Sequence, residues 1–89
     1  MNQLTDQQLE FLEILAKNMG VVSNALLKMN LSRDNFDIWM KNNFFKQQVQ
    51  VINEQAIDYV ENQLMKKIND GDLTAIQFYL KTKGKKRGY

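Results

Sequence analysis

Residues 22–39, VSNALLKMNLSRDNFDIW, decide the fold of this 89-residue chain. Apolar residues recur at helical spacing through residues 22–29, which predicts a helix over that range. Asn30 tolerates the positive φ of a tight turn, and Ser32 is a preferred helix N-cap. We therefore predict a second helix over residues 33–42, joined to the first by a short turn.

Two short helices joined by a tight turn are typical of a helix-turn-helix, which places its second helix in the major groove of DNA. Exposed residues near the start of that helix reach base edges, where Arg can bind guanine, Asn can bind adenine and Asp can accept from cytosine. The residues expected to contact DNA from this segment are Arg33, Asn35 and Asp37, with Ser32 at the N-cap, and Ser23, Asn24 and Lys41 for phosphates.

The charge of this segment keeps a second interpretation open. Asp34 and Asp37 place two negative charges on the face that would meet DNA, and only Arg33 and Lys41 balance them. Affinity for DNA depends chiefly on positive charge at phosphates. The same hairpin could therefore serve only to pack a three-helix bundle.

A further helix is predicted at the start of the chain. Thr5 and Gln8 have the spacing of a capping box, which places the helix over residues 6–18. Gly20 then ends it in a left-handed conformation. The face expected to meet the core comprises Leu9, Leu12, Ala16 and Met19, with Phe11 and Leu15 flanking it.

The second half of the chain predicts a long helix over residues 43–69 and a shorter one over residues 73–83. Asp70-Gly71 ends the first helix, Asp72 caps the second, and the short link folds the second back antiparallel. The predicted fold is therefore all-α. It has a three-helix helix-turn-helix head (1–43), a helical hairpin (44–84) and a basic tail (85–89).

The long helix carries more apolar surface than the chain can easily cover. At about 1.5 Å per residue it extends ~39 Å, and one apolar stripe runs along its length from Phe45 to Ile68. A second, broken stripe comprises Phe44, Val51, Tyr59 and Met65. We expect these four residues to contact another copy of the chain, although packing against the shorter helix is the alternative.

Positive charge is concentrated at the C-terminus. The last nine residues contain five bases and no acid, namely Lys81, Lys83, Lys85, Lys86 and Arg87. The first 80 residues contain seven bases and ten acids. Such a basic tail favours a polyanionic partner or is simply a solvated end, so these five residues are further candidates for DNA binding.

Several classes of function find no support in the sequence. The chain has no Cys and no His, which excludes His- or Cys-based catalysis and the commonest metal sites. It has no nucleotide-binding glycine motif, no apolar run long enough to span a membrane and no signal-peptide pattern. We therefore expect a cytosolic protein that is not an enzyme and uses no cofactor or metal.

Two segments resemble phage small terminase subunits and related homeodomain-like phage proteins. One is residues 22–49, VSNALLKMNLSRDNFDIWMKNNFFKQQV, and the other is residues 71–89, GDLTAIQFYLKTKGKKRGY. The second segment is the more specific match. The resemblance implies a non-enzymatic protein that binds double-stranded viral DNA at the packaging start site and assembles into a ring. It also implies that the ring presents DNA to a large terminase subunit with ATPase and nuclease activity, in the cytoplasm of an infected bacterial host.

Two alternatives stay open beside this interpretation. The same head could belong to a transcription regulator or a recombinase-type DNA adaptor, for which a dimer reading a palindrome would be expected. The helices could also serve only assembly, with the basic tail contacting acidic groups on proteins.

Overall fold

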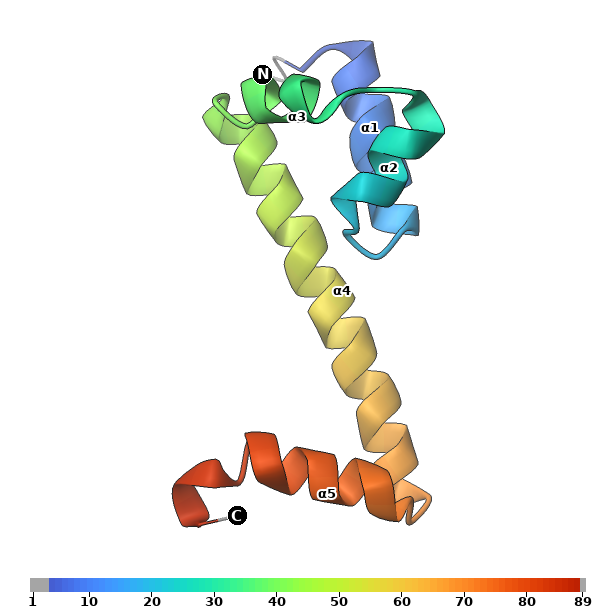
Figure 1. Cartoon of the computed structure of the whole chain (residues 1–89), viewed down its shortest axis with the longest axis vertical. Coiled ribbons are helices and arrows are strands. Elements are labelled where there is room, and N and C mark those ends of the chain that lie inside the picture. Colours follow the sequence, from blue (N-terminus) through green and yellow to red (C-terminus); the bar gives the residue numbers. More distant parts are fainter. Residues whose placement is uncertain (1–3, 89) are drawn as a thin grey trace. The chain divides into compact units, whose positions relative to one another are not determined.

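The computed structural model describes residues 4–88, which contain five α-helices, one 3-10 helix and no β-strand (Figure 1). The predicted all-α class is confirmed. The elements are α1 (Asp6–Lys17), α2 (Val22–Met29), α3 (Arg33–Trp39), α4 (Asn43–Asn69), α5 (Leu73–Thr82) and η1 (Lys85–Arg87). The chain divides into two compact units, the head unit (Met1–Ala56) and the hairpin unit (Ile57–Tyr89).

Capping interactions set the ends of the helices. The Thr5 hydroxyl accepts a hydrogen bond from the Gln8 backbone N–H at 3.1 Å, and Gln8 Oε1 accepts one from the Thr5 backbone N–H at 2.9 Å. Ser32 and Asp72 cap α3 and α5 through their side-chain oxygens. These caps are the predicted ones, because each depends only on residues within one turn.

The turns of the head unit use left-handed residues. Asn30 ends α2 with φ 55°, as predicted, while Met19 and Gly20 have φ 58° and 79° in the loop between α1 and α2. Gly20 also approaches α4 closely, since a Cβ at this position would lie 2.5 Å from Asn53 Oδ1. A side chain at residue 20 would therefore strain the backbone and also collide with Asn53 on α4.

An aromatic cluster forms the centre of the head unit. Phe11 is fully buried, and its ring centroid lies 5.7 Å from that of Phe36, 5.6 Å from Trp39 and 6.1 Å from Phe45. These rings come from α1, α3 and α4, so the cluster joins three helices. The remaining buried apolar residues of this core are Leu12, Leu15, Ala25, Leu26 and Val49.

The face predicted for the first helix is wrong in most of its residues. The buried residues of α1 are Gln8, Phe11, Leu12 and Leu15. Of the four residues predicted to share the core face, only Leu12 is buried, whereas Leu9, Ala16 and Met19 are exposed. Phe11 and Leu15, predicted to flank that face, are both buried. The helix is rotated towards Phe11, because that ring packs against the aromatic side chains of α3 and α4.

The start of α4 belongs to the head unit. Asn42 Oδ1 accepts hydrogen bonds from the backbone N–H groups of Phe44 at 2.9 Å and Phe45 at 3.2 Å. Phe45 and Val49 are buried in the aromatic-centred core, and Ile52 packs against it. The compact unit therefore extends to Ala56, beyond the predicted head of residues 1–43.

The hairpin unit comprises the end of α4, a turn at Gly71 with φ 84°, and α5. After Gly71, α5 turns back but splays from this part of α4, so the antiparallel packing predicted for these two helices is not seen (Figure 1). Ala75 is the buried residue of α5. Further along the helix Phe78 and Tyr79 are exposed, whereas Ile76 and Leu80 are half-buried. The predicted tail (85–89) begins with η1, and Tyr89 lies outside the described residues.

Candidate nucleic-acid interface

α3 presents a mixed acidic and apolar surface. This helix has seven residues, shorter than the predicted range of 33–42. Its exposed residues are Arg33, Asp34, Asp37 and Ile38, and Ile38 is 61% exposed. One positive and two negative side chains leave this surface with a net negative charge.

The candidate base-contacting residues of α3 have partners within the helix. Arg33 Nε lies 3.9 Å from Asp37 Oδ1, and its guanidinium carbon lies 5.4 Å from the centroid of the Phe36 ring. The Ser32 hydroxyl accepts the Asn35 backbone N–H at 3.3 Å, and Asn35 is half-buried. The Arg33–Asp37 contact joins two side chains that are each 64% exposed, and it partly neutralises the charge that Arg33 offers to a base edge.

The start of α2 offers a different kind of contact. Its N-cap is Val21, which makes no side-chain capping hydrogen bond. Ser23 and Asn24 are exposed in the first turn, where backbone N–H groups lack partners within the helix. Such a helix start can face a phosphate, and exposed Lys41 is a further cation in the head unit.

The strongest positive charge lies at the end of the hairpin unit. Lys81, Lys83, Lys85, Lys86 and Arg87 are all exposed on α5 and η1. Lys83 Nζ lies 3.3 Å from Glu61 Oε2, whereas the other four make no ion pair within the described residues. Overall the hairpin unit contains seven basic and four acidic residues, and the head unit five basic and six acidic.

The structure thus distributes the predicted DNA-binding residues over three surfaces. The first surface is α3 with its N-cap Ser32 and with Lys41, which follows the helix. Ser23 and Asn24 lie at the start of α2, and the five C-terminal bases lie on α5, at its C-cap Lys83 and on η1. The first two surfaces belong to the head unit and the third belongs to the hairpin unit.

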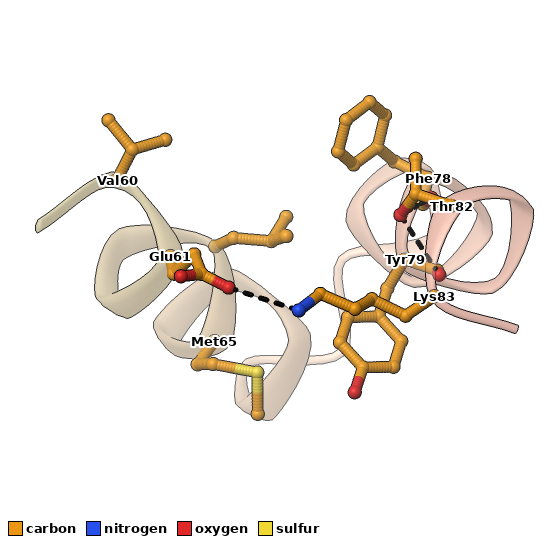
Figure 2. A pocket seen from close by; sticks show the side chains of 8 residues that line it. Val60, Glu61, Met65, Phe78, Tyr79, Thr82 and Lys83 are labelled. Atoms are coloured by element: carbon orange, nitrogen blue, oxygen red, sulfur yellow. Dashed lines mark hydrogen bonds and ion pairs between the residues drawn. The ribbon is translucent and has the colours of Figure 1, made fainter. Parts of the chain in front are cut away.

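The four predicted self-association residues are all exposed and all lie on α4. Phe44 and Val51 belong to the head unit, and Tyr59 and Met65 belong to the hairpin unit. Met65 lines a groove between α4 and α5, together with Val60, Leu64, Phe78 and Tyr79 (Figure 2). Sequence reasoning missed this groove because Val60 and Leu64 belong to the apolar stripe from Phe45 to Ile68, and the residues expected to contact a partner were those of the other stripe. The sequence feature that could have indicated the groove was the width of the apolar surface on α4.

Other site classes find no structural counterpart. No group of three acidic or other metal-binding side chains forms a metal site within residues 4–88, and no helix in that range is long and apolar enough to cross a membrane. No protein-family model, curated protein or solved structure matches the chain.

Proposed function

We propose that this chain is a non-enzymatic DNA-binding protein of viral genome packaging, a small terminase subunit. In this role an oligomer, expected to be a ring, recognises the viral genome and presents it to a large ATPase-nuclease subunit in the infected bacterial cell. The resemblance of residues 22–49 and 71–89 to that family motivates the specific role.

One structural observation supports DNA binding most strongly: the five exposed bases on α5 and η1. Four of them have no acidic partner among the described residues, so their charge is available to phosphates. Because cations bound at phosphates release counterions, this group would supply affinity without sequence preference. The head would add sequence preference through Arg33 and Asn35.

The two contributions can be separated by measuring binding at several salt concentrations. A Lys85→Ala/Lys86→Ala/Arg87→Ala variant should bind duplex DNA more weakly, and its slope of log K against log [salt] should fall by up to about 3. The matched control removes three exposed lysines elsewhere, in Lys17→Ala/Lys28→Ala/Lys46→Ala. Equal losses in both variants would mean that net charge alone, and not the C-terminal group, binds DNA.

The head requires its own test. Arg33→Ala and Asn35→Ala should each lower the preference for the packaging-site sequence over unrelated duplex DNA, by about 1–3 kcal/mol for a lost bidentate base contact. Binding to unrelated DNA should change little. Unchanged preference in both variants would remove the head from DNA recognition and favour a role in assembly.

A further inference from the structure

A groove opens between the two helices of the hairpin unit. It has a volume of about 370 Å³, and its lining includes Val60, Leu64, Met65, Phe78 and Tyr79 (Figure 2). The Glu61–Lys83 ion pair, at 3.3 Å, connects α4 with the end of α5 beside these residues. The groove is therefore an apolar surface with one charged bridge, and no described residue fills it.

The hairpin unit lacks a core of its own. Ala75 is its only buried residue among those described. Seven large apolar side chains are exposed instead: Ile57, Tyr59, Val60, Met65, Leu73, Phe78 and Tyr79. Chains below about 40 residues usually need a metal, a disulfide or a partner to stay folded, and this unit has 33 residues and no Cys.

The uncovered area suits an interface between two protein chains. Aromatic side chains bury about 150–250 Å² each, so seven half-exposed large side chains leave on the order of 600 Å² uncovered. A standard interface buries about 800 Å² per partner. Summed over all its surfaces, the hairpin unit thus exposes an apolar area close to that of one side of a standard interface.

α5 carries a second apolar stripe that does not line the groove. Leu73, Ile76 and Leu80 follow the spacing of one helix face, and at 3.6 residues per turn this face lies opposite Phe78 and Thr82. Leu73 is 67% exposed, and Ile76 and Leu80 are half-buried. The hairpin unit therefore has an apolar groove and a separate apolar stripe.

We propose that α5 of a second copy of this chain occupies the groove, with its Leu73–Ile76–Leu80 stripe facing Val60 and Phe78. Charge is compatible with this occupant. Lys81 follows Leu80 of the stripe on one copy, and Asp58 borders the groove-lining side of α4 on the other and has no ion pair within the described residues. Since the groove and the stripe are different surfaces, the contact is heterologous and propagates into a ring or a filament. This inference rests on the self-association in the proposed function and identifies its interface.

Substitutions at two positions test the contact in the full-length protein. Leu73→Asp lies in the first turn of α5, where an acid is favourable to the helix, and Thr74→Asp places the same charge on the adjacent residue. Val60→Asp adds charge to the groove, and Asn62→Asp adds it on another face of α4. Sedimentation velocity should show oligomers for the wild type, Thr74→Asp and Asn62→Asp, and a monomer for Leu73→Asp and Val60→Asp. Circular dichroism should show equal helix content in the wild type, Thr74→Asp and Asn62→Asp, whereas the two monomeric variants should keep the helices of the head unit.

Oxidative cross-linking tests the pairing even if a charged variant fails to fold. Since the chain has no Cys, Val60→Cys and Leu73→Cys proteins can be mixed without background. A disulfide between the two variants is expected. Wild-type protein that sediments as a monomer, oligomers that survive Leu73→Asp, or cross-linking of Val60→Cys only with itself would each overturn the inference.

DNA binding is scored separately on the same proteins. If the wild type assembles and cross-links as expected but binds no duplex DNA at low salt, the interface stands and the proposed function fails. If Leu73→Asp remains oligomeric while the wild type binds DNA, the function stands and the interface fails.

Discussion

Gly20 lies where the loop between α1 and α2 meets α4. Its φ of 79° is a conformation that residues with a Cβ adopt at a cost, and a Cβ there would also lie 2.5 Å from Asn53 Oδ1. The preceding residue, Met19, already carries a positive φ of 58°. The loop therefore concentrates two left-handed residues at its contact with the long helix.

Gly20→Ala should lower the free energy of unfolding of the head unit by about 1–2 kcal/mol, since Ala is strained in the left-handed region. In an Asn53→Ala background the loss should be smaller, because the contacting oxygen is gone, but it should not vanish. Urea denaturation followed by Trp39 fluorescence measures both values. A stability equal to that of the wild type would contradict the strained conformation.

The ion pair within α3 gives a second test at the residue scale. Asp37→Asn removes the carboxylate that lies 3.9 Å from Arg33 and lowers the negative charge of the α3 surface. If this surface meets DNA, affinity at low salt should rise about fivefold, since one charge contact near water is worth about 1 kcal/mol. Fluorescence anisotropy with labelled duplex DNA measures this, and Glu10→Gln on α1 is the control. An equal rise in the control would point to net charge instead.

Single-residue features of this chain were the most predictable from sequence. The Thr5–Gln8 capping box, the Ser32 and Asp72 caps and the left-handed Asn30 all appear in the structure. Each depends on atoms within a few residues along the chain. The Arg33–Asp37 pair has the same local origin, yet it lowers the availability of the residue expected to contact guanine.

At the scale of the helix, spacing predicted the elements but not always their orientation. A helix with apolar residues over a wide arc has several possible core faces. Which face of α1 is buried depends on Phe36, Trp39 and Phe45, which lie far along the chain from Phe11. Sequence spacing within α1 could not include those contacts.

The orientation of α1 leads to a matched pair of substitutions. Phe11→Ala should cost about 3–5 kcal/mol, because it opens a cavity at the centre of the aromatic cluster. Leu9→Ala, at the exposed position that spacing assigned to the core, should cost about 0.5 kcal/mol or less. Thermal or urea unfolding measures both, and comparable losses would mean that α1 is rotated towards Leu9.

At the scale of the whole molecule, the two units differ in how they are stabilised. The head unit has a continuous core built from four helices, whereas the hairpin unit buries only Ala75 among its described residues. A sequence can show that apolar surface is in excess, as the stripes on α4 did. It does not specify which surfaces pair, because that depends on how far α5 splays from α4.

This difference predicts how each unit responds to protein concentration. Binding of a second copy stabilises only the structure that it contacts. Amide hydrogen exchange in α5 should therefore slow as the concentration rises, while exchange in α1 and at Phe45–Val49 should stay constant. Mass spectrometry of peptides from the two units measures this. Exchange in α5 that does not depend on concentration would show that the hairpin unit is stable without a partner.

The aromatic cluster of the head unit has one more consequence. Trp39 is the only tryptophan, whereas all three tyrosines, Tyr59, Tyr79 and Tyr89, fall in the sequence of the hairpin unit. The chain therefore contains a separate natural chromophore for each unit. Indole emission, excited at wavelengths where phenols do not absorb, reports the environment of Trp39 beside Phe11 and Phe45, so the head unit can be followed in an unlabelled sample without a signal from the tyrosines.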